Sequence, residues 1–287
     1  MTSRVVVVTD SAASLPEPLA RRWNVSIVPL EVAVDGEPLA PSRLADLDYV
    51  LDALEARQKV TTSQPSVGAF TDAYAAAAEQ GASHIVSVHV TQTISGTVNA
   101  ARLAAKDASI PVTVVDSGSV GMGTGWPALA AAAKAKSGVE AEKVADEARR
   151  VAASVTMLFT VDSLEYLKRG GRVAPTVAAI GDALNIRPVL TVKNGELVVL
   201  QRVRSTPRAR ALVVDHAERA IARFDRPALA IMGLRAQAYA DDIAASLEVR
   251  HPKLAMLVRT PVTSVLAVHG GPGSFAAVVA DIPRELL

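Results

Sequence analysis

The chain has 287 residues, of which 50% are hydrophobic, 21% charged and 3% aromatic, and its 30 basic residues nearly balance 29 acidic ones. This composition supports one large domain or two of ordinary size with a core of Ala, Val and Leu, and it gives no general reason to expect nucleic acid or an anionic membrane as a partner. The absence of cysteine excludes disulfides, thiolate metal sites and a cysteine nucleophile. We expect a cytoplasmic protein with no signal peptide and no membrane-spanning helix, because no apolar segment approaches about 20 residues.

A continuous β-branched run at residues 5–8 predicts a strand that is buried on both faces, as in a parallel sheet. Asp10 follows it, at the carboxyl end of the strand, where open α/β sheets bind their ligands. Asp10 could orient another polar group, bind a metal or act as a plain turn residue, and we favour the plain role. A helix that opens at Pro16 follows.

Residues 25–34 indicate a strand with an interruption at Pro29, and residues 45–57 an amphipathic helix. The next loop, residues 61–66, contains Thr62, Ser63 and an amide just before a helix at residues 67–79. Ser66 could simply cap that helix. Several hydroxyl groups beside an amide exceed what a cap requires, so a ligand-binding role stays open.

The stretch from residue 91 to residue 101 lies between a predicted strand at residues 85–90 and a predicted helix at residues 100–108. It contains Ser95, Gly96 and Thr97. The first N–H groups of a helix lack partners within it, and Gly96 has no Cβ to keep an oxyanion away. The stretch therefore suits a carboxylate or a phosphate, although a capped turn without a ligand explains it equally well.

Glycines at residues 121–125 follow a strand at residues 112–115 and lead into an Ala-rich helix. Their spacing fails the dinucleotide-binding fingerprint. We interpret them as sites of close helix–sheet packing or as room for a ligand chain. Another helix is expected at residues 141–152, so the first half of the chain predicts a mostly parallel α/β/α sandwich.

Beyond about residue 155 the pattern changes, since Asn194-Gly195 between alternating apolar residues is a strong hairpin signal. Hairpins and long helices together predict an α+β domain, so we expect domains at residues 1–157 and 158–287. The remaining predicted strands are at residues 156–161, 189–192, 196–203, 229–232, 256–259 and 274–280, and the helices at 164–168, 209–223 and 238–247.

Three polar groups occur in this second half. Residues 168–172 form a basic turn, and Arg202 and Arg204 alternate along a predicted strand; a solvated surface explains both groups of arginines. His269 begins a Gly-rich turn that we place between two strands, where it either reaches across a cleft or serves as a turn residue. The other histidines show no ligand-like spacing with acidic residues, so we predict no metal site.

Seven short segments stand out in order along the chain: VVTDS (7–11), TSQPS (62–66), ISGT (94–97), VDS (115–117), LEYLKRGGR (164–172), LNIRP (184–188) and HGGPG (269–273). Together they resemble the DegV family of lipid-binding proteins. The resemblance spans nearly the whole chain, and the ordered set is specific although no single segment is decisive.

The resemblance implies a two-domain carrier that is not itself an enzyme, with one long-chain fatty acid, such as palmitate, in a tunnel between its domains and no cofactor. Members include the binding subunits of bacterial fatty acid kinases, which present the carboxyl group to a separate kinase for phosphorylation. A monomer is expected for such a carrier. By position, the carboxyl group would be bound by Thr62, Ser95, Gly96, Thr97 and His269, with Ser63, Asp10 and Gly270 in support, and Arg172 and Arg204 would dock the kinase. Gly270 departs from the family, which usually has Thr after the His.

Physical chemistry agrees with this interpretation. Burial of a C16–C18 tail gains about 0.8 kcal/mol per methylene, roughly 12 kcal/mol before the costs of association and chain ordering. A buried carboxyl group requires several converging hydrogen-bond donors. Two alternatives stay open: a regulatory protein plugged by lipid, and a serine hydrolase with Ser95, His269 and Asp10 as a triad. The hydrolase lacks the Gly-x-Ser-x-Gly elbow, because Ile94 stands where a glycine is needed.

Overall fold

The computed structural model describes residues 4–40, 46–173 and 186–287, and these residues form two compact units. Unit 1 comprises Met1–Leu30, Gln64–Val155 and Ala280–Leu287, and unit 2 comprises Glu31–Ser63 and Thr156–Val279. The division differs from the expected single boundary at residue 157. Residues 31–63 belong to unit 2 because their strands pair with each other and pack on a helix near the C-terminus. The last eight residues, 280–287, belong to unit 1.

Unit 1 is built on a four-stranded parallel sheet. The strands, in spatial order, are β2 (Val25–Val28), β1 (Val5–Asp10), β6 (His84–His89) and β7 (Val112–Asp116). Every residue of β1 is buried, as the β-branched run predicts for a central parallel strand. The pairing of Val8 with Ser87 brings the carboxyl ends of β1 and β6 together.

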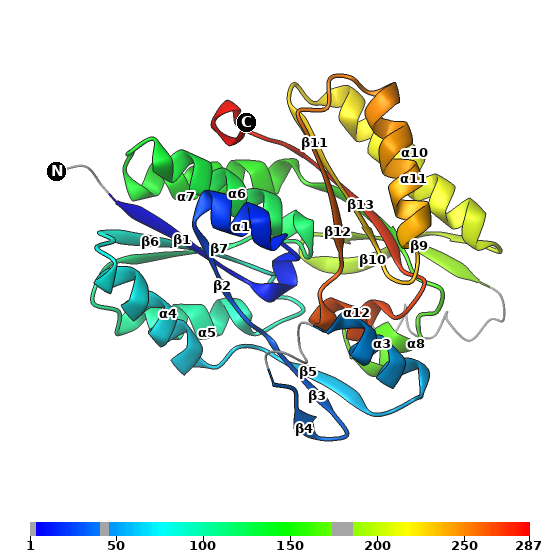
Figure 1. Cartoon of the computed structure of the whole chain (residues 1–287), viewed down its shortest axis with the longest axis horizontal. Coiled ribbons are helices and arrows are strands. Elements are labelled where there is room, and N and C mark those ends of the chain that lie inside the picture. Colours follow the sequence, from blue (N-terminus) through cyan, green and yellow to red (C-terminus); the bar gives the residue numbers. More distant parts are fainter. Residues whose placement is uncertain (1–3, 41–45, 174–185) are drawn as a thin grey trace. The chain divides into compact units, whose positions relative to one another are not determined.

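Helices cover both faces of this sheet. Figure 1 shows α4 and α5 on one face and α1, α6 and α7 on the other. Their bounds are α1 (Glu17–Trp23), α4 (Val67–Glu79), α5 (Thr97–Lys106), α6 (Met122–Lys136) and α7 (Ala141–Ser154). Short 3-10 turns, η1 (Ser11–Ala13) and η3 (Arg284–Leu286), complete the unit. The predicted α/β/α sandwich is therefore confirmed.

The glycines of α6 pack closely. A Cβ on Gly123 would overlap Ser119 Oγ and lie 2.9 Å from Ser119 Cβ, and one on Gly125 would lie 3.0 Å from the carbonyl oxygen of Ala13. Of the two roles expected for this glycine run, close packing is the one that the contacts support.

Unit 2 contains a six-stranded mixed sheet in the order β10-β9-β8-β13-β11-β12. Strands β8, β9 and β10 are antiparallel neighbours, β13 is antiparallel to β8, and β11 and β12 are parallel. Asn194 (φ 52°) and Gly195 (φ 82°) form the left-handed turn of the predicted hairpin. The bounds are β8 (Thr156–Thr160), β9 (Arg187–Lys193), β10 (Glu196–Val203), β11 (Pro227–Gly233), β12 (Met256–Pro261) and β13 (Phe275–Asp281).

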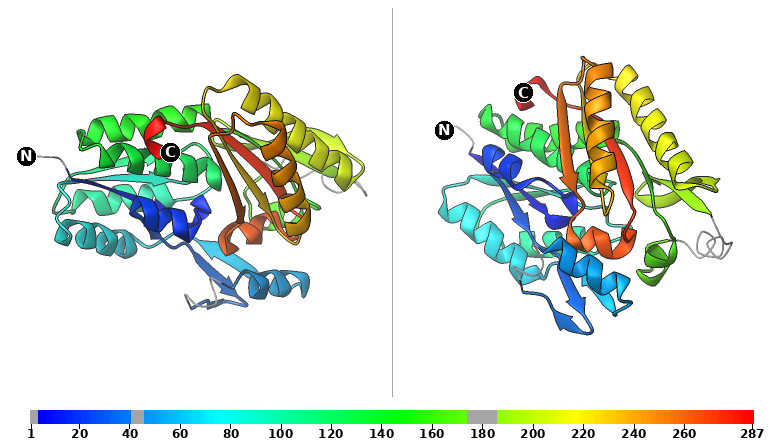
Figure 2. Two further views of the ribbon diagram at one scale, coloured as in Figure 1. Left: turned by 45° about the horizontal axis from the view of Figure 1, so that its top comes forward. Right: turned by 45° about the vertical axis from the view of Figure 1, so that its right-hand side comes forward.

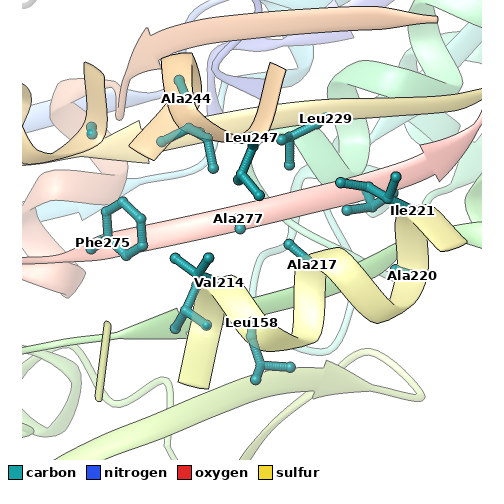
Figure 3. Close-up of a cluster of buried hydrophobic side chains, with 14 of the residues drawn as sticks. Leu158, Val214, Ala217, Ala220, Ile221, Leu229, Ala244, Leu247, Phe275 and Ala277 are labelled. Atoms are coloured by element: carbon teal, nitrogen blue, oxygen red, sulfur yellow. The ribbon is translucent and has the colours of Figure 1, made fainter. Parts of the chain in front are cut away.

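Two long helices, α10 (Thr206–Arg223) and α11 (Gln237–Arg250), run along one face of this sheet (Figure 2). Figure 3 shows Val214 and Ala217 of α10 and Leu247 of α11 facing Ala277 of β13. Ala217 and Ala277 are small at the contact between α10 and β13, and larger Val and Leu side chains fill the rest of this core, as its composition predicts.

Among its described residues, unit 2 also contains a small antiparallel sheet and three short helices. The sheet has the order β4 (Glu37–Pro38), β3 (Glu31–Val34) and β5 (Val60–Ser63), and the helices are α3 (Leu47–Glu55), α8 (Glu165–Arg169) and α12 (Ser264–Gly270). Helix α12 contacts α3, α8 and β5. Predicted residues 45, 184 and 185 lie outside the described residues. Within the described ranges, no helix combines the length and the apolar character needed to span a membrane.

Candidate functional site

Thr62 and His269 form a hydrogen-bonded pair in unit 2, with 2.9 Å between Thr62 Oγ1 and His269 Nε2. Thr62 lies on β5, paired with Val32 of β3, and its neighbour Ser63 projects from the other face of the strand, where it donates to Glu31 at 2.8 Å. His269 lies in the last turn of α12, so its expected place in a turn between two strands is wrong. The segment from residue 264 to residue 270 forms a helix because it packs an apolar face, including the buried Val265 and Val268, inside the unit.

A pocket of about 510 Å³ opens next to this pair, and the described residues that line it all belong to unit 2. The end of α3, strand β5, helix α8 and helix α12 contribute its walls. Tyr166 is its aromatic residue, and burial raises the pKa of the Tyr166 hydroxyl. The cations around the pocket are Arg57, Lys59, Arg169 and Arg172. A pocket with mostly apolar walls and this surplus of positive charge is suited to an anionic ligand.

Arg235 ties α3, one wall of the pocket, to the rest of unit 2. Its guanidinium bonds Asp48 at 3.0 Å and Asp52, and lies 3.5 Å from Glu55. Its backbone has φ 51°, a conformation that costs energy for a residue with a side chain. The three carboxylates of one helix hold Arg235 in place, and the helix with it.

The imidazole of His269 is packed against Gly170, the residue that ends α8. A Cβ on Gly170 would overlap His269 Nδ1 and lie 2.7 Å from His269 Cε1. Burial, reinforced by the nearby charge of Arg172, lowers the pKa of His269 from 6.5 to about 4. His269 is therefore neutral at physiological pH.

The glycines after His269 are also closely packed. A side chain on Gly270 would meet the hydroxyl of Ser274 at 2.9 Å, and that hydroxyl donates to the carbonyl oxygens of Gly270 and Gly271 at 2.8 Å each. Ser274 thus occupies the space where a Thr side chain at position 270 would go. Gly271 has φ 72° and lies against the ring of Tyr166, so only glycine fits there.

Ser95, Gly96 and Thr97 lie in unit 1, at the N-terminus of α5. The hydroxyls of Ser95 and Thr97 are 2.8 Å apart, and Ser95 Oγ also accepts the backbone N–H of Thr97 at 3.4 Å. The side chain of Gln64 lies directly against Gly96, where a Cβ would overlap its amide. The Ser95 hydroxyl therefore serves the first N–H of α5, and Gln64 of the preceding loop fills the space where a side chain at position 96 would go.

Asp10 orients a different histidine from the one that the hydrolase alternative requires. Asp10 Oδ2 lies 2.9 Å from Nδ1 of His89 and accepts the N–H of Val90 at 3.0 Å, while Oδ1 accepts the N–H of Ala12 at 2.9 Å. The network continues from His89 Nε2 to Ser87 Oγ at 2.6 Å and from there to the hydroxyl of Tyr74 at 2.9 Å. Burial raises the pKa of Tyr74 to about 12. All of these side chains are buried, so Asp10 is a structural residue of unit 1 and is committed to His89.

Arg172 lines the pocket beside His269 and donates to the carbonyl oxygen of Gly170. Arg204 is exposed just beyond β10 and does not line the pocket. The structure thus brings Thr62, His269 and Arg172 together in unit 2, while Ser95, Gly96 and Thr97 form their own group in unit 1. No cluster of three or more His, Asp or Glu side chains suited to a metal ion occurs in the part of the chain that the structure describes.

The described residues thus form two α/β units, one with a cation-lined pocket built around a Thr–His pair and one with a hydroxyl-rich helix N-terminus. The chain belongs to the DegV family: the family described as "Uncharacterised protein, DegV family" matches residues 4–281. The family expected from the sequence is thereby confirmed.

Individual relatives cover nearly the whole chain. A DegV domain-containing protein of Streptomyces coelicolor is 37% identical over 283 residues, which are 98% of this chain and 100% of the relative. The solved structure described as fatty acid binding of a DegV family protein from Thermus thermophilus is 30% identical, has a TM-score of 0.83, and is matched over 97% of this chain and 100% of that one. A DegV lipid-binding protein from Thermotoga maritima is 25% identical, with a TM-score of 0.85 over 96% and 98% of the two chains.

His89, Gly170 and Tyr166 are not among the functional residues that the sequence predicts. His89 lacks ligand-like spacing, yet Asp10 and His89 end adjacent parallel strands, and alignment of those strand ends pairs them. In the sequence, Gly170 is only part of a basic turn. Its contact with His269 joins segments about a hundred residues apart, and no local pattern predicts such a contact.

Proposed function

We propose that this protein binds a long-chain fatty acid, such as a C16–C18 acid, and that the Thr62 hydroxyl donates a hydrogen bond to its carboxyl group. The observation that carries the proposal is the Thr62–His269 pair in the wall of a positively charged pocket. The structural relatives from Thermus thermophilus and Thermotoga maritima, which are described as binding fatty acid and lipid, support the choice of ligand.

The chemistry of the pocket matches a carboxylate. Thr62 and His269 are half-buried, so a ligand can reach them. Arg172 and the other cations of the pocket supply positive potential without a sealed ion pair. A hydrogen bond from a neutral hydroxyl to a charged group contributes about 1.5–3 kcal/mol, enough to place the head group while the tail supplies most of the affinity.

We infer further that the bound acid is presented to a separate kinase, as the family resemblance implies. In that reaction a carboxylate oxygen attacks the γ-phosphorus of ATP, the bond to the β-phosphate oxygen breaks, and acyl phosphate and ADP form. This chain contributes the positioning of the carboxylate and leaves it reachable, and Arg204 and Arg172 contribute to docking. The protein then acts as a non-catalytic monomer that needs no cofactor.

The first experiment measures ligand binding directly. Native mass spectrometry of the purified protein is expected to show a retained species with the mass of a C16–C18 fatty acid. Thr62→Val removes the hydroxyl and keeps the shape of the side chain, and it is expected to weaken oleate binding by about 10-fold in a fluorescence or calorimetric titration. Thr71→Val, at an exposed position on α4 that does not line the pocket, is the control. Unchanged affinity of the Thr62 variant would exclude its head-group role.

A second experiment tests presentation to a kinase. With a bacterial fatty acid kinase subunit and ATP, the protein is expected to yield acyl phosphate, detected as the hydroxamate. Arg204→Ala is expected to slow that reaction and leave fatty acid affinity unchanged, while Lys106→Ala, an exposed cation on α5, changes neither. Absence of acyl phosphate with an active kinase would leave fatty acid binding alone as the function.

A further inference from the structure

The imidazole of His269 has one nitrogen without a partner. Nε2 is bonded to Thr62, but Nδ1 is buried and has no hydrogen-bond partner among the described residues. Gly170 lies directly against this atom, so close that a Cβ on Gly170 would overlap it. Neither a ligand nor a water molecule therefore has room at Nδ1.

This packing distinguishes the two neutral forms of the ring. If Nδ1 carried the proton, a buried N–H donor would have no acceptor, which folded proteins rarely tolerate. If Nε2 carries it, Nδ1 presents only a lone pair, and under-satisfied buried acceptors are tolerated better than orphaned donors. The second form also lets Nε2–H donate to Thr62 Oγ1 at the observed 2.9 Å.

We propose that Gly170 is a positioning residue that closes off Nδ1 of His269 and so fixes the ring as the Nε2–H tautomer, which makes Thr62 a hydrogen-bond donor toward the pocket. Because Thr62 Oγ1 already accepts from His269, its own O–H is directed to the ligand. The inference deepens the proposed function and rests on it for the identity of the ligand. It also assigns His269 an indirect role: His269 acts through Thr62 rather than by contact with the carboxylate.

The proposal explains why these residues occur together. A site whose hydroxyl can only donate favours a group that accepts, and an ionised carboxylate accepts with both oxygens. Burial and the charge of Arg172 keep the imidazole neutral at physiological pH, so a second ring proton does not compete. A larger residue at position 170 would displace the ring and free Thr62 to donate to His269 instead of the ligand.

The test starts with the wild-type protein in the absence of ligand. The ¹⁵N–¹H long-range correlations of the imidazole rings of ¹⁵N-labelled protein distinguish the two tautomers, and comparison with His269→Gln identifies which of the five histidines is His269. We expect the Nε2–H pattern at pH 7. The Nδ1–H pattern, or a doubly protonated ring, would overturn the proposal whatever the protein binds.

Variants then connect the tautomer to binding. Gly170→Ala is expected to change the His269 correlations and to weaken oleate binding about 10-fold, with no larger effect when it is combined with Thr62→Val, because both act on one hydroxyl. Gly68→Ala on α4, where a Cβ has only ordinary contacts, is the matched control. If Gly170→Ala does not fold, the comparison of Thr62→Ser with Thr62→Val replaces it: Ser is expected to keep the wild-type tautomer and affinity.

The two proposals fail in different ways. The Nε2–H tautomer together with unchanged affinity of Thr62→Val would reject the carboxyl-binding role of Thr62 and leave the role of Gly170 intact. An additive loss of affinity in the Gly170→Ala, Thr62→Val double variant would show that Gly170 acts elsewhere and would overturn the inference.

Discussion

Asp10 Oδ2 lies 2.9 Å from Nδ1 of His89, and both side chains are completely buried at the carboxyl ends of adjacent parallel strands. The same carboxylate accepts two backbone N–H groups, those of Val90 and Ala12. Asp10 thus holds together the turns that leave β1 and β6, and the second of these turns leads to Ser95.

Asp10→Ala is expected to lower the free energy of unfolding by at least about 3 kcal/mol, because it leaves three buried donors without an acceptor at about 1–3 kcal/mol each. Urea denaturation followed by circular dichroism measures the change. Asp72→Ala, an exposed position on α4, is the control and is expected to stay within about 0.5 kcal/mol of wild type. Equal stabilities of the two variants would contradict the structural role of Asp10.

The free energy of unfolding is expected to decrease as the pH is lowered, because His269 titrates. Its pKa is about 4 in the folded protein and 6.5 ordinarily, so the unfolded chain binds more protons between these values. The contribution of the neutral His269 ring to the free energy of unfolding is fully present above pH 6.5 and is lost as the pH falls toward 4. At about 1.36 kcal/mol per pH unit, this contribution amounts to roughly 3 kcal/mol. Denaturation curves of wild type and His269→Gln at pH 7.5, 6, 5 and 4 isolate this residue. Parallel pH profiles would show that His269 is not the group responsible.

Ser95→Ala is expected to weaken fatty acid binding by about 1–2 kcal/mol if the carboxyl group engages the N-terminus of α5 as well as Thr62. That the acid lies between the two units stays a prediction, and a double-mutant cycle with Thr62→Ala tests it. A coupling energy of about 0.5 kcal/mol or more indicates a shared carboxyl group, whereas additive losses indicate independent effects. No loss in Ser95→Ala would remove this turn from the site.

Gly123→Ala in α6 and Gly68→Ala in α4 are expected to have opposite effects on stability. Alanine is favoured over glycine in helices by up to about 1 kcal/mol, and at Gly68 the nearest atom to a new Cβ is 3.7 Å away. At Gly123 the new Cβ would overlap the buried Ser119, and overpacking typically costs about 1–3 kcal/mol. Thermal midpoints of the two variants should therefore move up for Gly68→Ala and down for Gly123→Ala; a rise in both would show that Ser119 moves aside without cost.

Most helices and strands could be predicted from local patterns. Helix α4 has the predicted bounds, Val67–Glu79, and the Asn194-Gly195 hairpin forms where the turn residues indicate it. These elements depend on periodicity and turn chemistry, which are local properties of the chain. The change of pattern near residue 155 and the family resemblance both predict the two-domain fold class, which the structural matches confirm.

Long-range contacts were harder to predict. The assignment of residues 31–63 to unit 2 depends on β-pairing between Val32 and Thr62 and on packing against α12. A strand of four residues is too short for its sequence pattern to predict either its partner strand or the helix that packs on it. His269 was expected in a turn because the glycines after it suggest a loop, whereas packing of the apolar residues before it favours a helix. The Thr62–His269 pair itself came from the family resemblance, since 207 residues separate its members.

The interrupted course of unit 2 has a consequence for biosynthesis. A ribosome that adds about 5–20 residues per second would release Thr62 roughly 10 to 40 seconds before it reaches His269. During that interval β3 and β5 lack the later half of their core, and Val32, which is 1% exposed in the finished protein, faces water. The nascent chain therefore exposes an apolar segment without its packing partners for most of its translation. Strands β3 and β5 are thus the expected contact for a chaperone that acts during synthesis.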